Sequence, residues 1–320
     1  MAVLTIVLVV VGLMVAVRAY NKMTMGRCRC TARLDGKVVI VTGANTGIGK
    51  EAARDLAARG ARVILACRDL QKADQARDDI VASTGNRNVL IRQLDLLSLA
   101  SVRAFAKGVL QTESRLDVLI NNAGAGGLPN QRTPDGLTMG MQANHFGPFL
   151  LTCLLLDLLR KTQGSRLIMV SSMAHPYGHF DIDNMDCEKS YNGFYLYCNS
   201  KLCNILTAQY IAQKVKGVTA NSLHPGVVQT DILRNVKTAW IRNVADRGIG
   251  LLFKSAAEGA QTTIHLAVSE EGGRVTGKYF SDLKVTAPGG PANVPGLAEQ
   301  MWKRSEKYVK LADDERPFRD

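Results

Sequence analysis

A tyrosine and a lysine in this sequence have the types and the spacing for acid–base chemistry on an alcohol or a carbonyl. Tyr197 and Lys201 are four residues apart, which places both side chains on one face of a helix. A phenol with a pKa of about 10 is a weak acid–base catalyst at neutral pH, and a neighbouring ammonium stabilises its phenolate. Because this spacing is common on ordinary surface helices, the pair becomes informative only together with other motifs.

Three further motifs follow predicted strands and supply that context. Asn121-Asn122-Ala123-Gly124, Ser171-Ser172 and Pro225-Gly226 each come directly after a run rich in Val, Ile or Leu. Open α/β sheets bind ligands at the carboxyl ends of their strands. The sequence therefore predicts one site that gathers these motifs with the tyrosine and the lysine.

A glycine-rich loop follows the first predicted strand and opens the first predicted helix. Its residues are Thr42, Gly43, Ala44, Asn45, Thr46, Gly47, Ile48 and Gly49. Gly43 permits a tight turn, Gly47 lets the backbone approach a pyrophosphate, and Gly49 allows close packing of helix and sheet. The exposed amides and the helix dipole favour anionic phosphate. An ordinary glycine-rich turn is the alternative, but the strand–turn–helix context favours a dinucleotide site.

The end of the second predicted strand bears on the choice of dinucleotide. An acidic residue there would bind the ribose 2′-hydroxyl of NAD, but this strand closes with Cys67, followed by Arg68. A guanidinium can form a two-pronged contact with a 2′-phosphate. We therefore predict NADP(H) over NAD, although Arg68 could be a solvated loop charge and Asp69 keeps NAD open.

The elements that must position these residues alternate along the chain. Helical stretches such as Ile48–Ala58 and Ser98–Thr112 separate short strands, a pattern typical of βαβ units around a buried parallel sheet. We expect a single α/β domain with a doubly wound parallel sheet. Its expected strands are Lys37–Thr42, Ala61–Ala66, Asn88–Leu94, Leu116–Ile120, Ser165–Ser171, Gly217–Ser222 and a short one near Gly277–Phe280.

The N-terminus precedes this domain with an apolar run followed by cations. Ala2–Val17 is apolar except for a threonine and a glycine, and it reaches spanning length only if the run extends to Tyr20. Because the charge follows the apolar run and no good cleavage site appears, we predict an uncleaved anchor in residues 1–20. An interfacial helix and a cleaved targeting segment are the alternatives. A basic linker at 21–35 and a catalytic domain at 36–320 complete the predicted organisation.

Charge and cysteine content narrow the partners and the compartment. The net charge is +12, but residues 1–33 carry five cations and no acid, which leaves +7 mixed among acids in the rest. Without a basic stripe or a recognisable motif, we predict no nucleic-acid partner. Seven cysteines without CxxC pairs favour free thiols in a reducing compartment. We predict no metal site, because Pro176 and Gly178 break the helix that His175 and His179 would need.

The motifs together resemble the short-chain dehydrogenase/reductase family over residues 36 to about 285. Within that family the chain is similar to the membrane-anchored retinol dehydrogenases. This likeness rests on the segments VTGANTGIGKEAA, ILACRD, NHFG, VSSMAH, YCNSKL, LHPGVVQT and GKYFSDLK, together with the N-terminal apolar run. The resemblance implies the Rossmann-type fold, a nicotinamide cofactor, and interconversion of a lipophilic alcohol with its aldehyde or ketone, retinol and retinal being the first choice.

The resemblance also implies a role for each matching residue. Tyr197 would exchange the proton with the substrate oxygen, and Lys201 would hold the nicotinamide ribose and lower the pKa of Tyr197. Ser172, rather than Ser171, would bind the substrate carbonyl, and Asn144 would hold a water that relays protons. The remaining cofactor contacts implied by the family are Asp95 and Leu96 after the third strand, Asn122, Ala123 and Gly124 after the fourth, and Pro225, Gly226, Val228 and Thr230 after the sixth.

The remaining regions of the sequence do not identify the substrate. Asp231–Ala256 mixes apolar residues with cations, which suits either an amphipathic helix on the core or a lid that touches the bilayer. The segment His175–Phe194 is expected beside the substrate mouth. Steroid or lipid-aldehyde turnover and a non-catalytic nucleotide-binding scaffold are the alternative functions, and a homo-oligomer stays open. We expect membrane lipid as a partner and an endoplasmic-reticulum membrane, with a mitochondrial one as the alternative and the domain in the cytosol.

Overall fold

The structure is a computed structural model that describes residues 12, 16, 18, 19, 22, 23, 25–228 and 253–318. Within these residues the core is one eight-stranded sheet in the order β3-β2-β1-β4-β5-β6-β7-β8. Its strands are β1 Val38–Thr42, β2 Arg62–Cys67, β3 Val89–Gln93, β4 Val118–Asn121, β5 Ser165–Val170, β6 Val218–His224, β7 Tyr279–Ser281 and β8 Lys284–Thr286.

Seven of these strands run parallel, which confirms the expected doubly wound sheet. The chain adds β2 and β3 on one side of β1 and then crosses back to place β4 on its other side. The carboxyl ends of β1 and β4 therefore border the crevice where such sheets bind ligands. The eighth strand was not expected: β8 returns antiparallel to β7, with Phe280 opposite Val285. Three residues are too few for a detectable alternation in the sequence.

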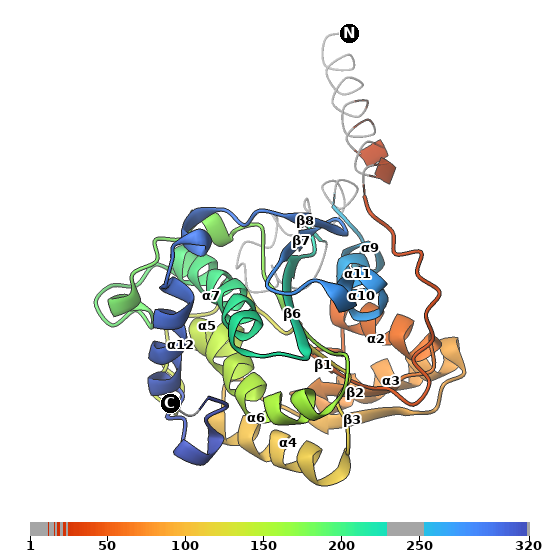
Figure 1. Ribbon diagram of the computed structural model, residues 1–320. Helices are drawn as coiled ribbons and strands as arrows, with labels where there is room; N and C mark the ends of the chain where they lie inside the picture. Colours follow the sequence, from red (N-terminus) through yellow and green to blue (C-terminus); the bar gives the residue numbers. More distant parts are fainter. Residues whose placement is uncertain are drawn as a thin grey trace.

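Helices cover both faces of the sheet (Figure 1). One buried cluster joins α2 and α3 and the later α10 to the sheet, and the other joins α4, α6, α7 and α12 to its opposite face. These helices are α2 Gly47–Ala58, α3 Leu70–Thr84, α4 Leu99–Thr112, α6 Gly147–Lys161, α7 Gly193–Lys214, α10 Gln261–Val268 and α12 Leu297–Tyr308.

The short elements are α5 Met139–Met141, a π-helical turn Gln142–Phe146, two 3-10 turns His175–Tyr177 and Ile182–Asn184, α9 Ala256–Gly259, α11 Glu270–Arg274, and 3-10 turns Gly290–Asn293 and Asp313–Glu315.

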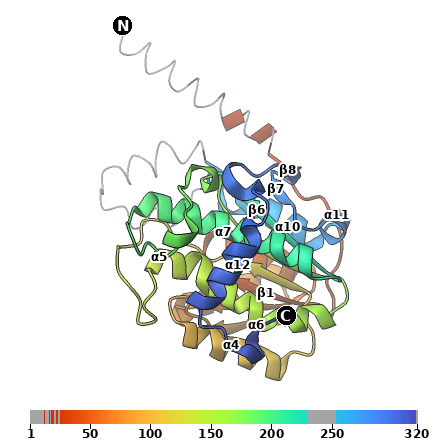
Figure 2. The same cartoon turned by 60° about the vertical axis from the view of Figure 1, so that its left-hand side comes forward.

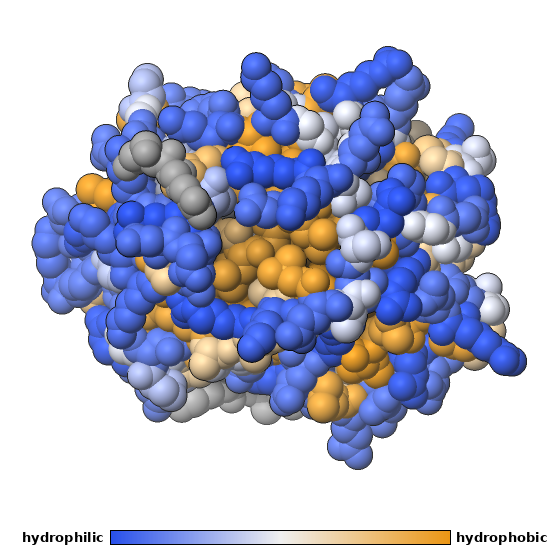
Figure 3. Space-filling view, turned by 60° about the horizontal axis from the view of Figure 1, so that its bottom comes forward, coloured by the Kyte–Doolittle hydropathy of each residue, from blue (hydrophilic) through white to orange (hydrophobic). Residues whose placement is uncertain are grey.

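Figure 2 shows α12 in front of the layer that contains α6 and α7. Its Trp302 packs between Phe149 of α6 and Tyr210 of α7. Figure 3 turns the bottom of Figure 1 forward, where α4 and α6 lie, and shows a hydrophobic area framed by hydrophilic side chains.

The described part of the N-terminal region packs against the domain. Arg59, the C-cap residue of α2, donates to the carbonyl oxygens of Cys30 and Ala32, at 2.7 and 3.0 Å. Arg18 forms an ion pair with Glu258, at 3.2 Å, and donates to the carbonyl oxygen of Phe253. Most of the predicted anchor Ala2–Tyr20 lies outside the described residues. Among those that are described, no helix combines the length and apolar character needed to cross a bilayer.

Candidate active site

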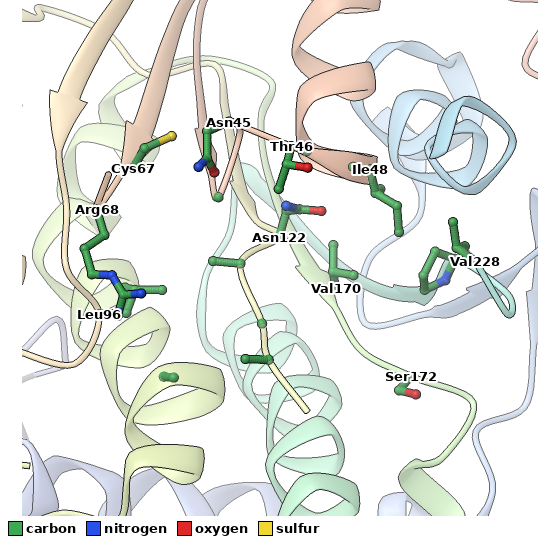
Figure 4. Close-up of a pocket in the computed structure, with 18 of the residues that line it drawn as sticks. Asn45, Thr46, Ile48, Cys67, Arg68, Leu96, Asn122, Val170, Ser172 and Val228 are labelled. Carbon is green, nitrogen blue, oxygen red and sulfur yellow. The ribbon is translucent and has the colours of Figure 1, made fainter. Parts of the chain in front are cut away.

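A cavity of about 500 Å³ opens at the carboxyl ends of the strands. In Figure 4, Cys67 and Arg68 lie at one end of this cavity, and Ser172 and Val228 lie at the other. Sequence-predicted residues line most of it: Gly43, Asn45, Thr46, Gly47, Ile48, Gly49, Arg68, Asp95, Leu96, Asn122, Ala123, Gly124, Ser172, Tyr197, Lys201, Pro225, Gly226 and Val228.

Three predicted residues are not on this wall. Ala44 is fully buried in the core beneath the glycine loop, so its side chain supports the loop from behind. Asn144 is also fully buried, one layer behind the cavity. Thr230 lies outside the described residues, as does most of the Asp231–Ala256 segment, although Phe253 from the end of that segment does line the cavity.

The glycine loop has the geometry that its sequence predicts. Gly43 and Gly47 have φ angles of +64° and +58°, a region that favours glycine. At Gly49 a Cβ would lie 2.5 Å from both Asn122 Nδ2 and the Gly43 carbonyl oxygen. The turn therefore needs glycine for its backbone angles, and the helix start needs it for close approach.

The first turn of α2 lines the cavity. Its N-cap residue Thr46 makes no side-chain cap bond, whereas Asp69 caps α3 and Ser98 caps α4. The first amides of a helix have no partner within the helix, and its dipole is positive at this end. These residues can therefore hold the phosphates of a dinucleotide.

Thr42 is a residue of this loop whose supporting role the sequence did not reveal. Its hydroxyl oxygen accepts from the amides of Asn122 and Ala123, at 3.0 and 2.9 Å. Asn122 Nδ2 in turn donates to the Thr42 carbonyl oxygen at 2.9 Å. These bonds join the ends of β1 and β4 and fix the loop against the Asn122–Gly124 turn. Because the two strands are far apart in sequence, only their adjacency in the sheet shows this contact.

Two exposed cations lie at the cavity edge just beyond the end of β2, one in the loop that follows and one in the first turn of α3. Arg68 is one of them, and Lys72, which sequence analysis missed, is the other. Asp69 lies between them, but its carboxylate accepts from the Lys72 amide at 3.0 Å and so caps α3. Cys67 is buried, and burial raises the pKa of its thiol to about 11. The acid that favoured NAD is thus engaged in a helix cap.

The other end of the cavity brings Tyr197 and Ser172 together. Both residues line the cavity, and Ser172 is a hydrogen-bonding neighbour that lowers the pKa of the Tyr197 phenol. Ser171, the less favoured of the two serines, donates instead to the Lys201 carbonyl oxygen at 2.7 Å and is buried. The hydroxyl available at the cavity wall is therefore that of Ser172.

The pKa values of Tyr197 and Lys201 differ from what the sequence predicts. Burial raises the pKa of Tyr197 above its ordinary value, with the hydrogen bond from Ser172 opposing that rise. Lys201 Nζ lies 5.9 Å from the centre of the Tyr197 ring and donates to the Val170 carbonyl oxygen at 3.2 Å. Burial lowers the pKa of Lys201 to about 8. The expected lowering of the Tyr197 pKa by Lys201 is not found here, because burial has the largest influence on the phenol.

Asn144 lies in the π-helical turn Gln142–Phe146. Its side chain accepts from the Ala125 amide at 2.8 Å and donates to the Ala125 carbonyl oxygen at 3.0 Å and to Ser200 Oγ at 3.3 Å. Ser200 belongs to α7, between Tyr197 and Lys201. Asn144 therefore connects the β4 loop to the helix that carries the tyrosine and the lysine. π-helical turns are frequent at functional sites.

Two neighbouring regions complete the surroundings. After β6, Gly226 adopts a φ of +88°, and Lys254 donates to the Pro225 carbonyl oxygen at 3.4 Å. The segment His175–Phe194 contributes no residue to the cavity wall. Its His175 is instead buried, with Nε2 accepting from the Gly289 amide at 3.0 Å. Apolar residues that the sequence did not single out also line the cavity: Ala125, Leu128, Met173 and Val227.

Comparisons with known proteins agree with this geometry. The family model described as short chain dehydrogenase matches residues 37–240. Human retinol dehydrogenase 11 is 43% identical over 304 residues, covering 94% of each chain. Human retinol dehydrogenase 12 is 44% identical over 282 residues, covering 88% of each chain.

Two solved structures share the fold. An uncharacterised protein from Mycobacterium paratuberculosis has a TM-score of 0.70 and 30% identity, covering 87% of this chain and 95% of its own. A short-chain dehydrogenase from Shigella flexneri complexed with NADP has a TM-score of 0.63 and 26% identity, covering 79% of this chain and 100% of its own.

The chain belongs to the short-chain dehydrogenase family. It is an oxidoreductase that acts on an alcohol or a carbonyl with a nicotinamide cofactor, and its resemblance to retinol dehydrogenases is confirmed.

Proposed function

We propose that this chain uses NADP(H) to interconvert a lipophilic alcohol and its aldehyde, with retinol and retinal as the first choice. The observation that carries the proposal is the shared wall of one cavity. That wall has the uncapped start of α2 on one side and Tyr197 with its neighbour Ser172 on the other. A nucleotide and a small carbonyl compound can therefore meet there.

Each polar side chain near the reacting carbon has a distinct role in the proposed reaction. Ser172 donates a hydrogen bond to the substrate oxygen, which orients the carbonyl and polarises it. Tyr197 delivers its phenolic proton to that oxygen during reduction and recovers it during oxidation. Lys201 binds the ribose and stabilises the phenolate that remains. Asn144 holds the loop around Ala125 and supports proton exchange with solvent.

The cofactor supplies the hydride, and the chain supplies its binding site. The amides of the glycine loop and of the α2 start would hold the pyrophosphate. Arg68 would contact a 2′-phosphate, with Lys72 as a second cation. The Asp69 carboxylate that would favour NAD is bonded to the α3 backbone, which supports NADP(H).

A lipophilic substrate is supported by the apolar part of the wall and by the relatives. Met173, Val227 and Phe253 line the cavity beside the polar pair. The retinol dehydrogenases at 43–44% identity are named for a retinoid alcohol. A steroid or another lipid aldehyde would suit the same lining.

The test of this function is an assay with the purified full-length chain. NADPH or NADH would be combined with retinal, a steroid ketone and an aliphatic aldehyde, with the Tyr197→Phe variant as the matched control. We expect NADPH-driven reduction with retinal as the best substrate. If the steroid ketone or the aliphatic aldehyde is turned over best, that compound class would replace retinal as the proposed substrate. Cofactor binding without turnover of any of them would favour the non-catalytic scaffold.

The N-terminal segment is proposed to anchor the enzyme in the endoplasmic reticulum, with the domain facing the cytosol. The intact chain should then resist carbonate extraction, and protease added to sealed microsomes should digest the domain. Deletion of residues 1–20 should lower turnover of membrane-dissolved retinal while sparing a water-soluble aldehyde. An equal loss on both substrates would show that the segment supports folding rather than substrate delivery.

A further inference from the structure

Behind the wall that carries Tyr197 lies a row of buried polar side chains that the proposed reaction does not use. The Val170 carbonyl oxygen, at the end of β5, accepts from Lys201 Nζ at 3.2 Å and from Asn204 Nδ2 at 3.3 Å. A carbonyl oxygen has two lone pairs, so these two donors use its full capacity. Asn204 and Lys201, one turn apart on α7, are therefore held by the same atom.

His145 is fully buried and has Asn204 as a neighbour. Its Nε2 atom is 2.8 Å from the Ser305 hydroxyl of α12. Its backbone directly follows Asn144 in the π-helical turn. The π-helical turn that carries Asn144 therefore also carries an imidazole next to Asn204, the side chain that shares the Val170 carbonyl with Lys201.

Two atoms of this row are buried without a hydrogen bond of ordinary geometry in the described part of the chain. They are His145 Nδ1 and Asn204 Oδ1. The two side chains are nevertheless neighbours, because Asn204 acts on His145 as a hydrogen-bonding partner. Buried polar atoms are costly when they lack a partner. These two atoms can satisfy each other if a proton lies between them.

Only one arrangement of protons satisfies the whole row. With the proton on Nδ1, His145 donates to Asn204 Oδ1, and its Nε2 accepts the single hydroxyl proton of Ser305. The Met301 carbonyl oxygen, 2.8 Å from that hydroxyl, does not need this proton, because it lies four residues before Ser305 in α12 and accepts from the helix backbone. With the proton on Nε2, two acceptors would face each other at Asn204. Reversing the Asn204 amide would only move the conflict, since its oxygen would then lie 3.3 Å from the Val170 oxygen. Burial lowers the pKa of His145 to about 3, so the imidazole is neutral at physiological pH.

We propose that His145 is a positioning residue: its neutral imidazole, protonated on Nδ1, holds the Asn204 amide against the Val170 carbonyl and thereby fixes Lys201. The inference rests on the proposed function, because it assigns the support of the proposed ribose-binding and proton-relay groups. It extends that function to a residue that makes no contact with the cavity.

Two substitutions of His145 separate this role from simple packing. In asparagine the amide nitrogen occupies the place of Nδ1, and in glutamine it extends toward the place of Nε2. His145→Asn therefore keeps the donor to Asn204, whereas His145→Gln keeps only the contact to Ser305. We expect His145→Gln to lose at least about tenfold in kcat and in NADPH affinity, and His145→Asn to stay within about threefold of the wild type.

Thr207→Val is the matched packing control. Thr207 is buried on the same helix, and its hydroxyl bonds only to the Cys203 carbonyl oxygen, at 2.9 Å. This variant should lower the melting temperature without changing kcat per folded site or NADPH affinity. Equal kcat and affinity in the two His145 variants at equal folded fraction would overturn the proposal.

A measurement on the wild-type chain does not depend on any variant folding. Nitrogen NMR of protein labelled at histidine distinguishes the two neutral tautomers. His175, whose Nε2 accepts from the Gly289 amide, should give one Nδ1-protonated signal. We expect a second signal of this form across neutral pH, and we expect this second signal to be lost in His145→Asn. An Nε2-protonated signal that disappears in His145→Asn would contradict the proposal, whereas His224, whose Nδ1 accepts from the Gly226 amide, should keep such a signal in both proteins. NMR and NADPH titration both remain informative if no substrate is turned over, so failure of the proposed function is distinguishable from failure of this inference.

Discussion

The charged groups at the two ends of the cavity differ in their exposure to solvent. At the β2 end, Arg68 and Lys72 are exposed, and Asp69 is fixed as a helix cap. At the α7 end, Lys201 is 3% exposed and bonds to a backbone carbonyl rather than to an acid. One end presents screened cations to solvent, and the other keeps a single cation away from it.

This difference assigns cofactor recognition to the β2 end of the cavity and the chemical step to the α7 end. An exposed cation changes affinity by modest amounts, because water and salt weaken its field. A buried ammonium is costly to keep charged, but its effect on a neighbouring phenol is strong for the same reason. We therefore expect changes at the α7 end to affect turnover and stability, and changes at the β2 end to affect the choice of cofactor.

The largest effect is expected at Tyr197. Tyr197→Phe removes the phenolic proton while keeping the ring, so NADPH should still bind while turnover falls by at least about 10²-fold. Steady-state kinetics together with a fluorescence titration of NADPH would measure both quantities. Near-normal turnover would remove Tyr197 from the proposed mechanism.

Lys201 provides a prediction about stability with a definite direction in pH. Its pKa falls from 10.5 to about 8 on folding, so keeping it charged destabilises the folded chain below about pH 8. Lys201→Met should then raise the free energy of unfolding at pH 7 by up to about 3 kcal/mol, while turnover is lost. This gain should shrink as the pH rises from 8 toward 10.5. Denaturant unfolding at several pH values measures it, and a gain independent of pH would contradict the assigned cause.

A smaller effect is expected at the β2 end. Arg68→Asp should repel a 2′-phosphate and offer an acceptor to a ribose hydroxyl. The ratio of kcat/KM for NADPH over NADH should fall about tenfold or more, because a charge-assisted contact is lost. Lys161→Asp, an exposed change outside the cavity, is the control. An unchanged ratio in Arg68→Asp would make Arg68 an ordinary loop charge.

The smallest expected effect is that of salt. At about 0.15 M ionic strength, charges separated by more than about 8 Å are largely screened. NADPH affinity should therefore weaken several-fold more than NADH affinity as salt is raised, and Arg68→Asp should remove most of that difference. The kcat at saturating cofactor should hardly change. An equally strong salt dependence of kcat would show that the α7 end is not shielded as its burial suggests.

Local patterns were enough to predict much of this molecule. Seven parallel strands, the helices at 47–58 and 99–112, and the glycine turn all follow from short-range periodicity and backbone requirements. The spacing of Tyr197 and Lys201 likewise places them on one helix. The sequence also carried the family assignment, because its motifs occur in a fixed order along the chain. A physical reason unites these successes: each depends on residues close together in sequence.

Other features were decided only in the folded chain, some by where an element begins and others by the meeting of distant segments. From the sequence, Asp69 was a candidate to bind the ribose of NAD. In the structure its carboxylate caps the start of α3 instead. The raised pKa of Tyr197 comes chiefly from its burial in the folded chain. Thr42, Lys72, Asn204 and His145 acquire their places from strand order and helix packing. Hydrogen bonding and desolvation depend on the three-dimensional neighbours of a group, and the sequence alone does not say which residues those are.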